Sequence, residues 1–232
     1  MSSGVEAFVL ERIAAAPLLR EPFEHCIVDG VFPEDFYESI IDQWPEEDSW
    51  RPLSESGRVS AGSYEQRQVV LMNREGFARL DAERRAFWEG EVGGWLLGNR
   101  FKGEVLAKFG KEKQDSSGDA LIVSDRTRYA IGPHTDATHR LVSLLFYLPE
   151  DATFSRFGTA FYTPLDPAFR CAGGPHHPFK LFRRVRTVEF LPNRLVLFPK
   201  TDRCFHGVEP VDLAGIDRRL LIYNVRNSGS GS

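Results

Sequence analysis

The sequence predicts a mainly β fold of the jelly-roll type, supported by helices in its amino-terminal half. The first observation is that eight short β-like runs follow one another from about residue 119, with turn residues between them. The second is that the helix-length segments all precede that point. Short strands in close succession are typical of a sandwich or barrel rather than of alternating βαβ units. We therefore expect one domain, 1–232, with a helix-rich support region at 1–118 and a β core at 119–226.

The amino-terminal half is expected to form helices with a few strands. Residues 4–17 have the apolar spacing of a helix, and 33–45 begins and ends with proline and has acidic residues in its first turn. Residues 77–110 predict two helices that are separated near Gly93 and Gly94. The other elements expected in this half are the strands 25–30 and 67–72 and a mobile connection at 51–66.

The carboxy-terminal half supplies the predicted core. Its runs are rich in β-branched and aromatic residues, which favour strands. The tail 227–232, NSGSGS, is expected to be flexible. The eight expected strands are 120–125, 126–132, 140–148, 158–163, 183–191, 193–199, 205–211 and 218–225.

Composition argues against several classes of protein. A net charge of −4 over 232 residues gives no support for nucleic-acid binding, which requires a basic bias. Neither a membrane-spanning run of ~20 apolar residues nor a signal peptide is recognisable. The three cysteines, Cys26, Cys171 and Cys204, are odd in number and widely spaced, which argues against a disulfide framework. We expect a cytoplasmic protein with reduced thiols.

Two histidines and an aspartate are candidate metal ligands. In YAIGPHTDATHRLVSLLFYL, His134 and Asp136 are two residues apart, so on a strand their side chains point to one face and can bind one ion. His206, in FHGVEPV, is either a core residue or a third ligand. Two histidines and one carboxylate form the facial triad, which leaves coordination positions open and is typical of iron(II) oxygenases.

A buried cation is expected downstream, where DRRLLIYNV begins an apolar strand with Arg218 and Arg219. A dianionic cosubstrate that chelates iron would still bury its far carboxylate, and the planar guanidinium group binds carboxylates well. Strand alternation requires one of the two arginines to point inward and the other outward.

HTD, FHGVEPV and RRLLIYNV together resemble the iron(II)/2-oxoglutarate-dependent oxygenases, in the branch similar to prolyl 4-hydroxylases. YAIGPHTD, which begins at Tyr129, resembles the tyrosine-glycine approach to the first ligand, and FGTAFYTP stands where the family has a Gly-rich strand. FLPNRLVLFPKTDRCFHGVEP is similar to the strands that lead to the second histidine. The resemblance covers roughly 119–226, and HCIVDGVFPEDFYESIIDQWP resembles the amino-terminal support region.

The resemblance implies a double-stranded β-helix, with His134, Asp136 and His206 as ligands of Fe²⁺. It implies 2-oxoglutarate and O2 as cosubstrates and hydroxylation of a C–H bond, with release of succinate and CO2. The protein would hold iron, cosubstrate and target carbon in register and keep water out. Two other hypotheses are a non-catalytic jelly-roll module that binds a metal or ligand and a zinc hydrolase that uses the same triad.

The same resemblance implies residues for the far carboxylate of 2-oxoglutarate. Tyr147 stands where related enzymes have a tyrosine at this carboxylate, and Tyr129 is a further candidate. The family's arginine is commonly followed two residues later by a serine or small residue, but here leucines follow both arginines at that spacing. The spacing to the apolar strand favours Arg218 over Arg219.

The substrate is expected to be a small molecule, or a group borne by a carrier or polymer. Loop 164–186 has five basic residues and one acidic residue, and it contains adjacent glycines. It is either a lid over an acidic or phosphorylated substrate or a solvated edge that discourages strand pairing. His139 lies on the opposite strand face from His134 and is a poor ligand candidate. The candidate substrate-binding residues are His139, Arg140, Arg170, His176, Arg183 and Arg184.

Overall fold

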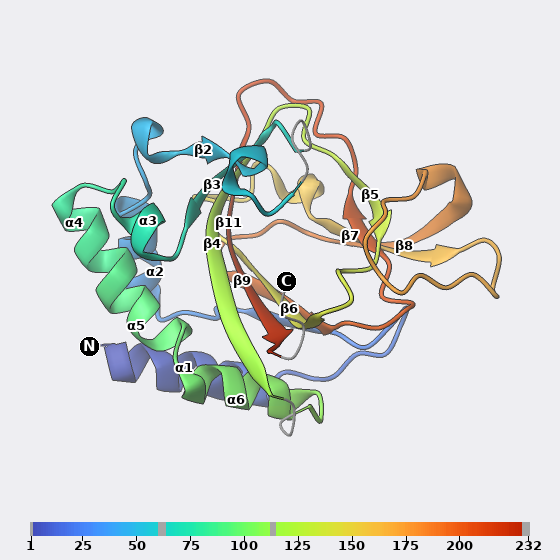
Figure 1. Ribbon diagram of the computed structural model, residues 1–232, viewed down its shortest axis with the longest axis horizontal. Coiled ribbons are helices and arrows are strands. Elements are labelled where there is room, and N and C mark those ends of the chain that lie inside the picture. The colour runs from blue at the N-terminus through green and yellow to red at the C-terminus, as the bar shows by residue number, and fades with distance from the viewer. Residues whose placement is uncertain (1, 60–63, 112–114, 229–232) are drawn as a thin grey trace.

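Two antiparallel β-sheets form the centre of the computed structural model, which describes residues 2–59, 64–111 and 115–228 (Figure 1). The larger sheet has the strand order β1-β9-β6-β11-β4-β3-β2, and the smaller one has the order β5-β10-β7-β8. This arrangement confirms the predicted jelly-roll core. The strands are β1 (Cys26–Asp29), β2 (Arg51–Pro52), β3 (Arg67–Leu71), β4 (Ser116–Arg126), β5 (Ile131–His134), β6 (Arg140–Tyr147), β7 (Thr159–Pro164), β8 (Phe182–Val188), β9 (Arg194–Pro199), β10 (His206–Val208) and β11 (Asp217–Asn227).

The helices lie on one side of the larger sheet and the smaller sheet lies on the other (Figure 1). None of the described helices is long and apolar enough to span a membrane. The helices are α1 (Ser2–Ala15), α2 (Glu34–Asp42), α3 (Arg74–Phe77), α4 (Ala82–Arg85), the π-helical η3 (Ala86–Val92), α5 (Gly93–Leu96) and α6 (Asn99–Lys108), with short 3-10 turns η1 (Glu47–Ser49), η2 (Leu53–Ser56), η4 (Ser155–Phe157) and η5 (Phe179–Leu181).

Strand alternation divides the hydrophobic core into two layers. On β6, Leu144 and Phe146 face the helices, whereas Leu145 and Tyr147 face the space between the sheets. Because both faces of this strand are covered, RLVSLLFYL is almost continuously apolar instead of alternating. The layer between the sheets is the one that opens into the functional site.

Several predicted boundaries differ from the structure. The helix predicted to break near Gly93 runs through that position, since residues 82–96 are continuously helical, and the chain turns at Gly98 instead. The expected strand 126–132 is interrupted by a turn at 127–130. The segment 51–66 contains β2 and η2, and its residues 60–63 lie outside the described part of the chain, as do residues 229–232 of the tail.

The amino-terminal half contributes to the sheet as well as covering it. β3 pairs with β4 and β1 pairs with β9, so both edges of the larger sheet come from the region expected to be mainly supporting. This placement brings Arg67, the first residue of β3, next to the core strands.

Candidate active site

His134, Asp136 and His206 converge on one point between the sheets. β5 and β10 are antiparallel, and His134 pairs directly with His206. The ring centroids are 4.4 Å apart, and Asp136 follows two residues after His134 in the turn beyond β5. One potential ligand atom from each of the three residues lies within 4.8 Å of the other two, and all three residues are buried. The fold therefore assembles the cluster from segments about seventy residues apart.

Hydrogen bonds orient each side chain of this cluster. Nδ1 of His134 lies 2.9 Å from the Gly132 carbonyl oxygen, and Nδ1 of His206 lies 2.9 Å from the Cys204 carbonyl oxygen. Since a carbonyl only accepts, both Nδ1 atoms must donate, which leaves the lone pair on Nε2. Such partners fix the tautomer and ring orientation of metal-binding histidines.

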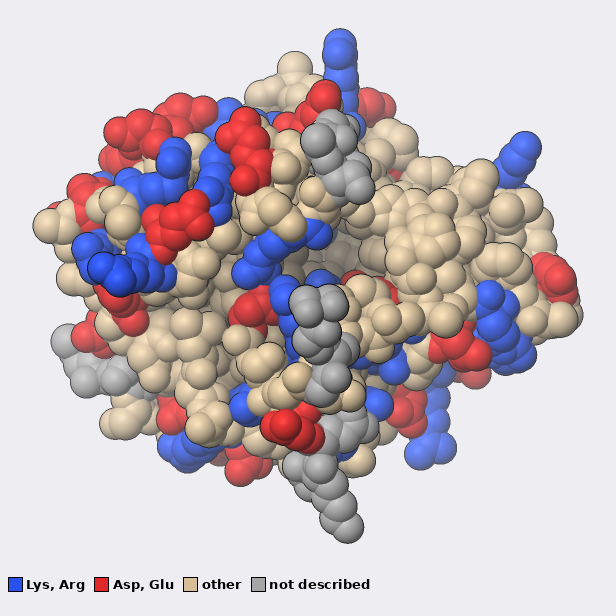
Figure 2. Space-filling model, viewed as in Figure 1, with Lys and Arg blue, Asp and Glu red and all other residues tan. Residues whose placement is uncertain are grey.

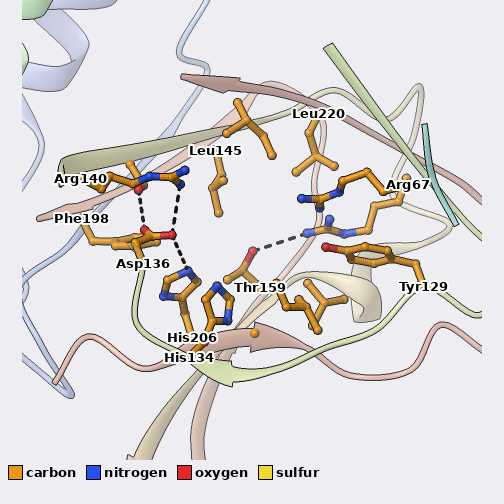
Figure 3. Close-up of a pocket in the computed structure, with 16 residues that line it drawn as sticks. Arg67, Tyr129, His134, Asp136, Arg140, Leu145, Thr159, Phe198, His206 and Leu220 are labelled. Carbon is orange, nitrogen blue, oxygen red and sulfur yellow. Dashed lines mark hydrogen bonds and ion pairs between the residues drawn. The ribbon is translucent and has the colours of Figure 1, made fainter. Parts of the chain in front are cut away.

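The carboxylate of Asp136 is held in the same way. Ser143 Oγ donates to Oδ2 at 2.6 Å. Arg140 Nη1 donates to Oδ1 at 3.1 Å (Figure 3). Burial acts to raise the pKa of Asp136, but the positive charge of Arg140, the two neighbouring imidazole rings and the hydrogen bond from Ser143 outweigh the effect of burial and keep this pKa below its usual value. Asp136 is therefore ionised near neutral pH.

Both histidines are neutral near neutral pH. Burial lowers the pKa of His134 and of His206, and the mutual proximity of the rings lowers the pKa of His134 further. Two neutral imidazoles and one carboxylate are a donor set ready for a divalent cation, because no proton has to be displaced. The set matches the 2-His-1-carboxylate facial triad that suits iron(II).

A cavity of about 80 Å³ extends from this cluster to a pair of arginines. Figure 3 shows the cluster on one side of the cavity and Arg67 with Tyr129 on the other. The lining between them is apolar and includes Leu145, Leu220 and Ile222. The cavity is thus polar at both ends and apolar in its middle.

Two arginines at the far end share a single carboxylate. Arg218 is almost fully buried, and it donates from Nη1 to Asp125 Oδ2 at 2.7 Å and from Nε to the Phe157 carbonyl at 2.7 Å. Arg67 donates to both oxygens of the same carboxylate, at 2.6 and 2.8 Å. One positive charge therefore remains uncompensated within this trio.

Tyr129 and Thr159 complete the far end of the cavity. Burial raises the pKa of Tyr129, so its phenol is neutral and can donate a hydrogen bond. Its hydroxyl is buried without a hydrogen-bond partner among the residues that the structure describes. Thr159 Oγ1 lies 3.4 Å from Arg218 Nη2. An excess positive charge and a free donor together suit a carboxylate.

The other two candidates for the far carboxylate, Arg219 and Tyr147, do not line the cavity. Arg219 faces outward, where it binds Glu150 at 2.7 Å and Asp217 at 2.9 Å. Tyr147 is not part of the cavity lining, although its ring centroid lies 5.7 Å from Cζ of Arg218, and its hydroxyl accepts a hydrogen bond from the Thr159 backbone N–H at 3.0 Å. The structure thus brings Arg218 and Tyr129 to the cavity, and it places Arg219 away from it.

The sequence interpretation missed Arg67, Thr159 and Ser143. Arg67 had a signal of the same kind as Arg218, because it is a charged residue at the start of an apolar strand, RQVVLM. Thr159 and Ser143 have no such signal, since small hydroxyl residues occur in strands of every kind.

The expected substrate residues fall into two groups. His139 and Arg140 line a second cavity that adjoins the first. His176 Nε2 lies 2.6 Å from Tyr64 Oη, and its ring centroid lies 4.7 Å from that of His134. These three residues are close to the metal-ligand cluster.

The basic residues of loop 164–186 lie farther out and line neither of these two cavities. Arg184 binds Glu209, Arg170 lies 3.8 Å from Asp202, and Arg183 is exposed on β8, at the edge of the smaller sheet (Figure 1). Gly173 of this loop has φ +142°, and an added Cβ would lie 2.4 Å from the Asp136 carbonyl oxygen. The loop is therefore packed against the ligand-bearing turn at its glycines, while its arginines face away.

Asp125→Asn is expected to destabilise the fold by about 3–5 kcal/mol, since it leaves the buried guanidinium group of Arg218 and the partly buried one of Arg67 without their shared carboxylate. Glu150→Gln is the matched control, because Glu150 is exposed and pairs with the outward Arg219, so its loss should cost less than about 1 kcal/mol. Chemical denaturation measures both free energies of unfolding. Equal losses of unfolding free energy in the two variants would contradict a stabilising interaction of Asp125 with Arg67 and Arg218.

The fold is similar to those of several solved structures. The structure is similar to a prolyl-4-hydroxylase from Pseudomonas putida, with a TM-score of 0.56 and 13% identity over 96% of this chain and 99% of that one. It is also similar to two proteins of nogalamycin biosynthesis described as non-heme alpha-ketoglutarate-dependent. These are the carbocyclase SnoK (TM-score 0.51, 16% identity, 98% and 85% coverage) and the epimerase SnoN (TM-score 0.51, 13% identity, 96% and 83% coverage). No protein-family model matches the sequence, and no curated protein matches it significantly.

The chain thus has the fold of the 2-oxoglutarate (alpha-ketoglutarate) and iron(II)-dependent oxygenases. The resemblance noted in the sequence is confirmed by this fold and by the buried His-Asp-His cluster.

Proposed function

We propose that the chain is an iron(II)- and 2-oxoglutarate-dependent dioxygenase that hydroxylates a C–H bond of its substrate. One observation carries the proposal: a facial-triad donor set and an arginine pair with spare positive charge occupy opposite ends of one small cavity. The similarity of fold to a prolyl-4-hydroxylase and to two alpha-ketoglutarate-dependent proteins supports it.

The residues at each end suit one part of the metal-cosubstrate unit. His134 and His206 would hold iron(II) through Nε2, and Asp136 would hold it through its carboxylate. When bound, iron(II) supplies the activation of O2 that is coupled to decarboxylation of 2-oxoglutarate, with release of succinate and CO2.

At the other end, Arg218, Arg67 and the Tyr129 hydroxyl would bind the far carboxylate. The two methylene groups of 2-oxoglutarate would lie against Leu145, Leu220 and Ile222. This part of the chain fixes the orientation of the cosubstrate and excludes water from its apolar middle.

Two alternatives explain fewer features. A zinc hydrolase would use the triad to activate water, but it has no use for a buried arginine pair at the far end of the cavity. A non-catalytic metal-binding module has no use for the unpartnered Tyr129 hydroxyl. Hydroxylation is proposed ahead of epimerisation or ring closure because the structural neighbour with the highest TM-score among those compared is a hydroxylase.

Anaerobic addition of Fe²⁺ and 2-oxoglutarate should produce the weak visible charge-transfer band of a chelated 2-keto acid. The experiment tests metal, cosubstrate and geometry together, and it needs no substrate. Succinate lacks the keto group, and Zn²⁺ has a filled d shell, so replacing either component should remove the band. A protein that gives no band with Fe²⁺ and 2-oxoglutarate is not the proposed oxygenase.

A further inference from the structure

A second and larger cavity, of about 390 Å³, adjoins the small one. Arg67, Arg140 and Ile222 line both, so a molecule in the larger cavity can reach the metal-ligand cluster. Its volume is in the range of small-molecule sites. Figure 2 shows that this face of the molecule is hollowed near its centre and that Lys or Arg side chains lie at the edge of the hollow.

The lining of the larger cavity is apolar on its floor and basic on its wall. Leu121, Val123 and Ile222 give it an apolar floor on the inner face of β4 and β11. Arg58 and Arg226 lie on its wall, and both bind the carboxylate of Asp119, with Arg226 Nη2 at 2.7 Å from Oδ2. Here too, two guanidinium groups share one carboxylate.

The charged groups of the two cavities leave an excess of positive charge. Among the described residues, five arginines line the cavities, and the carboxylates that they bind number three: Asp119, Asp125 and Asp136. The formal charge of Fe²⁺ is balanced by that of the 2-oxoglutarate dianion. The excess of two positive charges therefore remains in the loaded site, within a chain of net charge −4.

Unpartnered polar atoms lie in the same lining. Nε of Arg226, Nε of Arg140 and Oδ1 of Asn224 are buried and have no hydrogen-bond partner in the described part of the chain. Burial also lowers the pKa of Arg226. Buried polar groups without partners are costly, so acceptor atoms of a bound molecule would stabilise this region by satisfying the two arginine Nε–H donors.

We propose that the larger cavity binds the substrate of the proposed oxygenase and that this substrate is a small amphipathic anion. Its carboxylate or phosphate group lies against Arg226 and Arg58, and its apolar body lies over Leu121, Val123 and Ile222. The carbon to be oxidised passes between Arg67 and Arg140 toward the metal. The arginines of loop 164–186 are not part of this site.

The proposal is tested by measuring the binding of small anions to the protein, so no catalytic turnover is needed. Phenyl phosphate and phenylacetate are titrated calorimetrically into protein loaded with Zn²⁺ and 2-oxoglutarate, and benzyl alcohol is the neutral probe of similar shape. At least one of the two anions should bind more tightly than benzyl alcohol, and its affinity should fall as salt is added. The tighter of the two identifies the anionic group. An affinity for benzyl alcohol that equals that of both anions overturns the proposal.

Variants locate the bound anion. Arg226→Gln should weaken anion binding by about ten-fold or more, since a hydrogen bond to a charged group is lost. Arg226→Lys keeps the charge and should retain most of the affinity. The double variant R183Q/R184Q is the matched control and should bind like the unaltered protein. Equal affinities for R226Q and the unaltered protein, or a loss confined to R183Q/R184Q, overturn the proposal.

The design also separates this inference from the proposed function on which it rests. The same titrations are run on the metal-free protein, in which Arg58 and Arg226 are unchanged. If the charge-transfer band is absent but anion binding still depends on Arg226, the oxygenase proposal fails and the anion site stands. If the band forms but neither anion binds, the oxygenase proposal stands and the anion site fails.

Discussion

Replacing His206 by alanine is expected to abolish iron(II) binding and turnover while leaving the protein folded. His206 would provide one of three protein ligands, and its Nε2 is oriented by the bond from Nδ1 to the Cys204 carbonyl. Even the outer partners of metal ligands are worth 10- to 100-fold in affinity, so loss of a ligand should exceed roughly 100-fold. Iron content after dialysis, the charge-transfer band and 2-oxoglutarate consumption each measure the effect.

His25→Ala is the matched control for this variant. His25 is also fully buried, its Nδ1 lies 2.8 Å from the Phe23 carbonyl oxygen, and its ring packs edge-on against Phe161. It lies outside the ligand cluster, so His25→Ala should lose stability but keep iron. The triad is rejected if His206→Ala retains the iron affinity of the unaltered protein, or if His25→Ala loses iron to the same extent.

The ligand cluster could be predicted from the sequence because most of its information is local. His134 and Asp136 are two residues apart beside a strand, and His206 is conspicuous within an apolar run. The pairing of β5 with β10, which places the two histidines opposite each other, is the part that the fold supplies. Local spacing and one non-local pairing were therefore enough.

The arginine pair could not be predicted in the same way, because it depends on strand order. In the larger sheet, Asp125 pairs with Arg218 on one side and with Arg67 on the other. The sequence contains no local sign that β3 lies next to β4, so Arg67 was not recognised as a site residue. The positive charge of the small cavity results from the pairing of β4 with both β3 and β11, which places Arg67 and Arg218 on either side of Asp125.

The basic loop 164–186 shows a second limit of prediction from the sequence. The excess of basic residues in this loop is evident from the sequence, but composition does not tell the direction in which side chains point. β7 and β8 form a hairpin at the edge of the smaller sheet, and Arg183 and Arg184 are exposed there. The positive charge that lines the two cavities instead comes from arginines on β3, β6 and β11, and from Arg58.

Arg218→Ala is expected to raise the concentration of 2-oxoglutarate needed for binding far more than the concentration of iron. Arg218 is buried at the end of the cavity away from the ligands, so it would act on the far carboxylate alone. Loss of one partner of a buried, hydrogen-bonded charge pair costs about 2–5 kcal/mol, which is roughly 30-fold to several thousand-fold in affinity. The charge-transfer band, titrated with each component in turn, measures the two requirements separately.

Arg219→Ala provides the control at the adjacent position, because Arg219 points to the other face of β11 and binds Glu150 and Asp217. It should leave both requirements unchanged. The fold should tolerate Arg218→Ala, since Arg67 still binds both oxygens of Asp125 and that carboxylate stays compensated. If Arg219→Ala has the effect and Arg218→Ala does not, the register of β11 is off by one residue. If neither variant changes the 2-oxoglutarate requirement, the far carboxylate does not bind here, and the cosubstrate assignment fails while the metal-ligand cluster stands.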